Sequence, residues 1–145
     1  MIDEGKNVYL TYHAVEDLEL CKKIKEDYYQ AEDRVILCTE EYSCLEFDNI
    51  VGQFDFVIAS RFHAIVHAYK NAVPAIVLGW AVKYKELMTA FKQEKYMFDV
   101  RNQFEYEDIS TAVANMCRNC KEESIIIEEY LKEIQKDNVF DFIKL

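Results

Sequence analysis

Basic side chains stand where an apolar segment passes into an amphipathic one. The apolar run Phe54–Ala59 ends at Ser60, and Arg61 and His63 follow directly. This order is typical of a strand that enters a helix, with Ser60 as the N-cap and both basic residues in the first helical turn. The positive end of the helix dipole disfavours a cation there by roughly 0.3–1 kcal/mol. A bound anion, held by backbone N–H groups and basic side chains together, would remove this penalty.

The same arrangement occurs a second time. The apolar run Pro74–Leu78 breaks at Gly79, and Lys83 and Lys85 stand at the start of the next predicted helix. A carboxylate partner for Arg61, or simple hydration of the lysines, would explain either helix taken alone. Two successive strand ends favour an anion site, because the carboxyl ends of parallel strands line one crevice where ligands bind.

Strands and helices alternate along the chain, which predicts an α/β fold with a parallel sheet and helices on both faces. Continuous apolar strands agree, since a strand buried on both faces shows no polar alternation. We expect strands at Asn7–Thr11, Asp33–Cys38, Phe54–Ala59, Pro74–Leu78 and Lys95–Asp99. We expect helices at Val15–Tyr29, Glu40–Gln53, Arg61–Asn71, Lys83–Phe91, Tyr106–Arg118 and Ser124–Gln135.

Composition and charge argue against several classes of protein. The 145 residues fit one domain, and their formal net charge of −10 disfavours binding to nucleic acid or to anionic membranes. The opening residues, Met1–Lys6, are polar and predict no signal peptide. No apolar run approaches the ~20 residues that span a bilayer. Five cysteines, an odd number within helical and strand patterns, fit reduced thiols in a cytoplasmic protein.

The segment Asp55–Met88 resembles the polysaccharide pyruvyl transferase family. The similar pattern is an apolar strand, S-R-x-H-A opening a helix, a small-V-P turn into another apolar strand, and K-Y-x-E-L. The pattern continues more loosely through Gln93–Tyr96 to Asp99, so the middle third of the chain carries the resemblance.

This resemblance implies transfer of a pyruvyl group from phosphoenolpyruvate to a sugar of a surface polysaccharide precursor, which forms a ketal and releases phosphate. The sugar acceptor could be lipid-linked. The resemblance also implies a Rossmann-like domain similar to the C-terminal domain of a glycosyltransferase B-type fold. The chain is too short for two such domains. We therefore expect residues 1–145 to be the donor-binding part of a larger enzyme, inactive without the missing N-terminal domain.

The residues themselves suit phosphoenolpyruvate, which carries a phosphate and a carboxylate. A guanidinium engages either group in a bidentate manner, so Arg61 is the leading donor-binding residue. Lys83 would neutralise phosphate, and Ser60 with the backbone around Phe62 would cradle it. The resemblance implies donor contact and acid catalysis at His63, and a histidine can move protons near neutral pH. We expect no cofactor.

Other candidate residues have plainer interpretations. His67 follows His63 by four residues, half of a zinc pattern, but no third ligand has convincing spacing. We predict a packed or hydrogen-bonded His67 and no metal. Cys117 and Cys120 form a CxxC within a helical pattern, and without a second pair a structural interpretation is favoured.

The roles of Trp80 and His13 stay open at this stage. Trp80 is either a sugar platform or an aromatic lid on the core, and His13 lies near the same edge or in an unrelated loop. Two other functions also stay open. One is a nucleotide-sugar-binding domain of a glycosyltransferase, with Glu40 and Glu41 as ribose-binding acids. The other is a noncatalytic interaction domain of the same fold.

Overall fold

A computed structural model describes residues 1–102 and 105–136. The chain divides into two compact units, Met1–Ser43 and Cys44–Leu145. No described helix combines the length and the apolar character that crossing a membrane requires.

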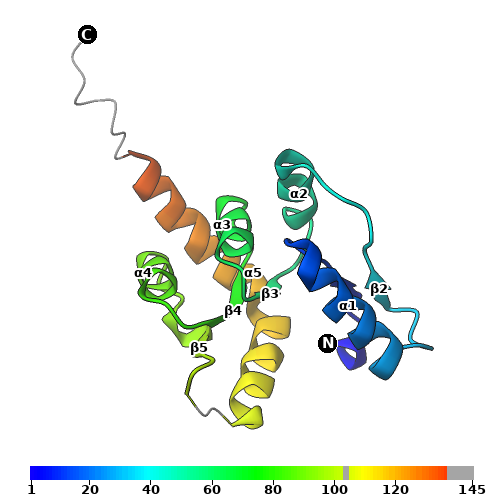
Figure 1. The fold of residues 1–145 in the computed structure, drawn as a ribbon. Coiled ribbons are helices and arrows are strands. Elements are labelled where there is room, and N and C mark those ends of the chain that lie inside the picture. Colours follow the sequence, from blue (N-terminus) through cyan, green and yellow to red (C-terminus); the bar gives the residue numbers. More distant parts are fainter. Residues whose placement is uncertain (103–104, 137–145) are drawn as a thin grey trace. The chain divides into compact units, whose positions relative to one another are not determined.

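The first unit is a β-α-β arrangement, drawn in blue to cyan in Figure 1. Its two strands are parallel, with Val8 beside Val35 and Leu10 beside Leu37. Its helix contacts the second strand and buries Cys21. The elements in chain order are the 3-10 helix η1 (Ile2–Glu4), β1 (Val8–Leu10), α1 (Val15–Tyr28) and β2 (Val35–Leu37).

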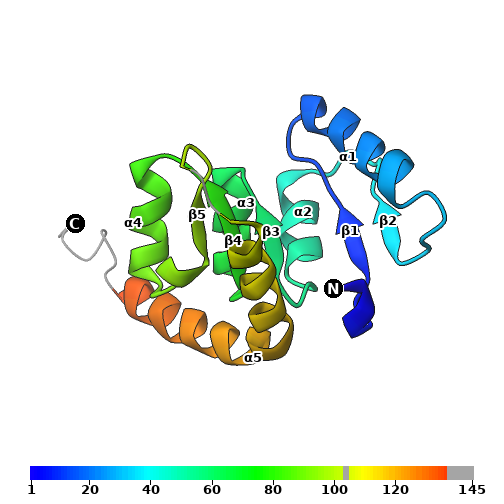
Figure 2. The same cartoon turned by 90° about the horizontal axis from the view of Figure 1, so that it is seen from below.

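The second unit contains a three-stranded parallel sheet in the order β3-β4-β5. Strands and helices alternate here as predicted, and Figure 2 shows the three strands side by side. The elements in chain order are α2 (Cys44–Val51), β3 (Val57–Ala59), α3 (Phe62–Lys70), β4 (Ala75–Gly79), α4 (Val82–Ala90), the 3-10 helix η2 (Glu94–Tyr96), β5 (Met97–Asp99) and α5 (Tyr106–Lys136).

The central strand β4 is buried on both faces. Its successive residues Ala75, Ile76 and Val77 are each 0% exposed, although their side chains point alternately to opposite faces. This is the burial that a continuous apolar strand predicts. The helix α3 packs on both β3 and β4 and also contacts α2 and α5. The helix α3 is therefore packed against two strands of the sheet and two other helices.

All five predicted strands are present and parallel, but they belong to two sheets rather than one. The first two pair with each other, and the last three form the sheet of the second unit. An apolar run specifies that a segment is a strand, whereas its neighbour in a sheet is chosen by long-range pairing. The prediction of one continuous sheet was therefore wrong.

The last two predicted helices are one continuous helix, α5, whose unbroken ribbon runs from yellow to red in Figure 2. Its buried positions include Met116, Cys120, Glu123 and Ile127, which share one face at spacings of three and four residues. Glu123, a buried residue of this helix, interrupts the apolar pattern between the two predicted segments. The sequence between the two predicted helices contains neither glycine nor proline, so nothing ends the helix there.

Two helices end in a left-handed residue that is not glycine. Ala72 follows α3 and Lys92 follows α4, and each has a φ of 55°. After Ala72, the N–H of Val73 donates to the carbonyl of Ala68 at 2.8 Å; after Lys92, the N–H of Gln93 donates to that of Met88 at 2.8 Å. Both are helix-ending motifs in which glycine is the usual residue.

Candidate functional site

The segments that follow β3 and β4 leave the sheet at the same edge. The two strands are parallel, and Ala59 lies beside Val77. Ser60–His63 follows the first strand, and Trp80–Lys83 follows the second. The sheet thus brings together the two chain segments to which the sequence assigned an anion site.

Tyr84, the third residue of α4, connects the chain after β4 to the chain after β3. Its hydroxyl donates to the carbonyl of Ser60 at 2.9 Å, and its ring meets Phe62 edge-on at 5.6 Å between centroids. The side chain is only 4% exposed. Sequence reasoning did not select Tyr84, because it stood within a pattern of helix residues and its long-range partner has no local signal.

Gly79 makes room for this ring. A Cβ added at Gly79 would lie 2.7 Å from Cγ of Tyr84, closer than real side-chain atoms approach. The glycine that ends the apolar run therefore has a packing role: it lets Tyr84 lie against the strand end. Trp80, the next residue, is 49% exposed and inclines toward Tyr84 at 5.9 Å between ring centroids.

Lys83 lies against the first segment as well. Its Nζ is 4.7 Å from the centre of the Phe62 ring, a cation–π distance. Lys83 therefore lies close to the side chain that follows Arg61. Ser60 and Lys83 are both exposed. A charged group held over an aromatic face and open to water can reach a ligand.

The helix start differs by one residue from the prediction. Arg61, with φ −90° and ψ 123°, is the N-cap of α3, and no side chain caps the helix there. Ser60 lies one residue before the cap, so the prediction of Ser60 as N-cap was wrong. The N-cap place requires an extended backbone, and the chain bends into the helix only after Arg61. His63 is the second helical residue, and both it and Arg61 are exposed.

The two helix starts share a charge pattern. Neither α3 nor α4, which are described throughout, has an acidic residue in its first turn. The α4 cap is Ala81, also without a side-chain cap bond, and Lys83 is the second residue of that helix. The N-terminal ends of two helices and cationic side chains thus coincide at neighbouring strand ends, an arrangement that suits an anion.

An ion pair that sequence reasoning missed lies at the end of β5, the third strand of this sheet. Asp99 lies beside Gly79, and Arg101 grips it in a bidentate manner, with Nε to Oδ1 at 3.0 Å and Nη2 to Oδ2 at 2.6 Å. The Arg101 guanidinium lowers the pKa of Asp99 to about 2. The charge of Arg101 is balanced by its own neighbour.

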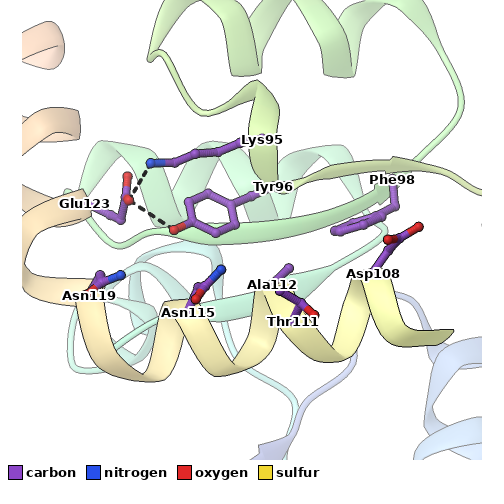
Figure 3. Close-up of a pocket in the computed structure, with 9 residues that line it drawn as sticks. All are labelled: Lys95, Tyr96, Phe98, Asp108, Thr111, Ala112, Asn115, Asn119 and Glu123. Atoms are coloured by element: carbon purple, nitrogen blue, oxygen red, sulfur yellow. Dashed lines mark hydrogen bonds and ion pairs between the residues drawn. The ribbon is translucent and has the colours of Figure 1, made fainter. Parts of the chain in front are cut away.

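A separate groove of about 520 Å³ runs between β5 and α5 (Figure 3). Its lining contains none of the predicted site residues. Glu123, 5% exposed, accepts hydrogen bonds from Lys95 at 2.6 Å and Tyr96 at 3.0 Å, as well as from the buried Gln93. Burial alone would raise the pKa of Glu123, but the bonds from Lys95, Gln93 and Tyr96 lower it below its ordinary value. This network explains how a carboxylate occupies the core.

His67 is hydrogen-bonded, as predicted: its Nδ1 lies 2.9 Å from Oδ1 of Asp48. Among the described residues, no three histidine, cysteine or acidic side chains are arranged around one metal position. All five cysteines are free thiols, as the sequence indicated, with Cys117 half-buried and Cys120 buried within α5.

The comparisons with known proteins gave one match. A family model described as polysaccharide pyruvyl transferase matches residues 1–81. The matched range includes Ser60, Arg61, Phe62 and His63, and Lys83 lies just beyond it. No curated protein and no solved structure gave a significant match.

Proposed function

The chain belongs to the polysaccharide pyruvyl transferase family, and on that basis we propose that it supplies the phosphoenolpyruvate site of a pyruvyl transferase. The observation that carries this proposal is the adjacency of two cationic helix starts at the ends of β3 and β4. The reaction would transfer a pyruvyl group to a sugar of a polysaccharide precursor and form a ketal.

The donor has two anionic ends, and the two helix starts offer complementary groups. Arg61 would bind the phosphate or the carboxylate of phosphoenolpyruvate through its planar guanidinium. Lys83, held 4.7 Å from the Phe62 ring centre, would neutralise phosphate from the neighbouring segment. Ser60 and the backbone at Phe62 would complete the cradle. Tyr84 supports this arrangement by holding the Ser60 carbonyl at 2.9 Å.

His63 would handle protons in this reaction. Protonation of the methylene carbon of phosphoenolpyruvate makes its central carbon electrophilic, and a sugar hydroxyl then forms a C–O bond there while losing its proton. Attack by a second sugar hydroxyl completes the ketal as the C–O bond to phosphate breaks and phosphate leaves. His63 is exposed in the first turn of α3, where one imidazole could deliver or accept such a proton.

We further propose that the donor site works with an N-terminal domain outside this chain, in an arrangement of the glycosyltransferase B type. Phosphoenolpyruvate would then bind to this chain, and the acceptor sugar would approach from the other domain. Turnover would require both domains, whereas donor binding would need only the site at β3 and β4.

Isothermal titration calorimetry on the chain itself tests the donor assignment. We expect phosphoenolpyruvate to bind, inorganic phosphate to bind more weakly because it lacks the carboxylate, and a uridine diphosphate sugar not to bind. Preferential binding of the nucleotide sugar would favour a glycosyltransferase domain instead. Binding of none of the three would indicate a noncatalytic domain with the same fold.

A further inference from the structure

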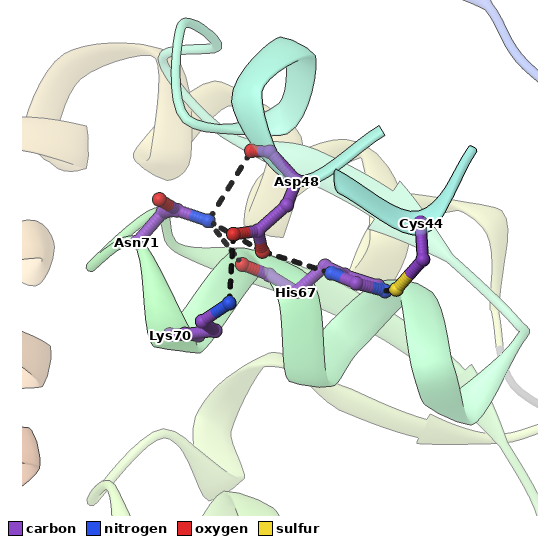
Figure 4. A network of polar contacts seen from close by, with 5 residues as sticks. All are labelled: Cys44, Asp48, His67, Lys70 and Asn71. Carbon is purple, nitrogen blue, oxygen red and sulfur yellow. Dashed lines mark hydrogen bonds and ion pairs between the residues drawn. The ribbon is translucent and has the colours of Figure 1, made fainter. Parts of the chain in front are cut away.

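Three side chains from α2 and α3 form a line from an exposed thiol to an anchored carboxylate (Figure 4). Cys44 is the first residue of α2, and its Sγ lies 3.7 Å from Nε2 of His67 on α3. The other ring nitrogen of His67, Nδ1, lies 2.9 Å from Oδ1 of Asp48. Asp48 is on α2, one turn after Cys44. The order thiol, imidazole, carboxylate is that of a nucleophile, a base and an orienting group.

The carboxylate determines which nitrogen of His67 carries the proton. Asp48 accepts hydrogen bonds from His67 and from Lys70, whose Nζ lies 2.8 Å from Oδ2, and these bonds lower its pKa to about 2. An ionised carboxylate has no proton to donate, so Nδ1 of His67 must be the donor. In the neutral ring, Nε2 then carries a lone pair and no proton, and it faces the thiol of Cys44.

The imidazole and the carboxylate are held firmly. The side chains of His67 and Asp48 are each 14% exposed. The Phe47 ring meets His67 edge-on at 5.4 Å, and the Asn71 amide donates to Oδ1 of Asp48 at 3.1 Å. Cys44, by contrast, is exposed, so a reagent in solution can reach its sulfur. The carboxylate of this relay is therefore largely buried, whereas its thiol is exposed to solvent.

Charged groups of both signs lie near the relay. Lys70 donates to the Asp48 carboxylate, and Glu46 stands in the first turn of α2. Lys70 and Asn71 on the α3 side also donate to Asp48, so hydrogen bonds besides that of His67 link the two helices. The contact of Cys44 with Nε2 of His67 comes in addition to these links.

We propose that Cys44 is a nucleophilic thiol activated by His67 and Asp48, and a site of covalent modification by alkyl halides and hydroperoxides. The thiol proton moves to Nε2 of His67 as sulfur attacks. With an alkyl halide, a C–S bond forms and halide leaves. With a hydroperoxide, sulfur attacks one oxygen and the O–O bond breaks. Sulfur is oxidised to the sulfenic acid, and the peroxide is reduced to an alcohol that takes the proton from His67.

Site-resolved alkylation of the whole chain tests this proposal. The protein is treated with iodoacetamide, and mass spectrometry follows the rate at each cysteine. The variant His67→Gln keeps an amide donor for Asp48 but removes the base. We expect it to slow alkylation of Cys44 about tenfold or more, while the rate at Cys117 stays the same. The matched control Lys70→Gln removes a partner of the same carboxylate and should change the Cys44 rate far less.

An unchanged Cys44 rate in folded His67→Gln would overturn the proposal. If that variant exposes Cys120 and proves unfolded, the unaltered protein gives a second test. Nitrogen-15 NMR of the His67 ring, recorded where the ring is neutral, should show the proton on Nδ1 and none on Nε2. A ring protonated on Nε2 could not accept the thiol proton, and that result would also overturn the proposal.

Discussion

At the scale of single residues, Arg61 gives the sharpest test of the donor site. It is exposed at the cap of α3, so its removal should leave the core intact. We expect Arg61→Ala to weaken phosphoenolpyruvate binding by about 1.5–3 kcal/mol, the scale of a hydrogen bond to a charged group. Calorimetry measures this. Arg118→Ala, which removes the same charge from an exposed place on α5, should leave the affinity unchanged. Equal losses in both variants would point to net charge rather than a site.

His63 should affect turnover more than affinity. If it moves a proton in the transition state, His63→Ala in the complete enzyme lowers kcat strongly while KM for phosphoenolpyruvate changes little. Steady-state kinetics separates the two parameters. The variant should stay folded because His63 is exposed on α3. A folded variant with full kcat would remove His63 from the catalytic assignment and leave only the scaffold resemblance.

At the scale of elements, the end of α3 carries removable strain. Ala72 has a φ of 55°, a conformation in which a Cβ is unfavourable and glycine is not. We expect Ala72→Gly to stabilise the fold by about 0.5–1 kcal/mol, measured by urea unfolding. The matched control Ala114→Gly lies within α5, where glycine should cost about 1 kcal/mol. Destabilisation by both would show that the turn after α3 is not limited by this residue.

Also at this scale, Asp48 on α2 links that helix to the α3 side by accepting bonds from His67, Lys70 and Asn71. The junction makes α3 a firm support for the candidate donor site at its start. It also links that support to the thiol of Cys44, because His67 belongs to both the junction and the proposed relay.

At the scale of the whole molecule, Asp48 should contribute to acid sensitivity. Its pKa falls from 3.8 to about 2 in the folded state, so its ionised form stabilises the fold above about pH 4. This contribution is lost as the pH falls toward 2, because the carboxylate becomes protonated. We expect Asp48→Asn to flatten the decrease in unfolding free energy between about pH 4 and 2, measured by denaturant titration at several pH values.

Asp99 provides the control for this prediction. Its pKa is also lowered to about 2, but its partner Arg101 is only two residues away in the chain. Such a local pair persists in part after unfolding, so it changes stability less. If Asp99→Asn and Asp48→Asn reduce the pH dependence of the unfolding free energy equally, the prediction that Asp48 contributes more than Asp99 is wrong.

The sequence by itself determined much of the local structure. Apolar runs located the strands of the described residues, because hydrophobic patterning is a local property. The alternation of strands and helices predicted the parallel pairing that is found within each sheet. Two cationic helix starts were identified from residue order: Arg61 and His63 follow one strand, and Lys83 follows the next. Parallel pairing of the two preceding strands then followed from the general geometry of α/β sheets.

Only the tertiary structure decided which distant groups meet. It divided the strands between two sheets, placed Glu123 in the core with Lys95 and Tyr96, and laid Tyr84 against Gly79 with its hydroxyl on Ser60. These contacts join residues far apart in the chain, and no periodic pattern encodes them. They depend on packing, which alone sets side chains from different elements within hydrogen-bond distance.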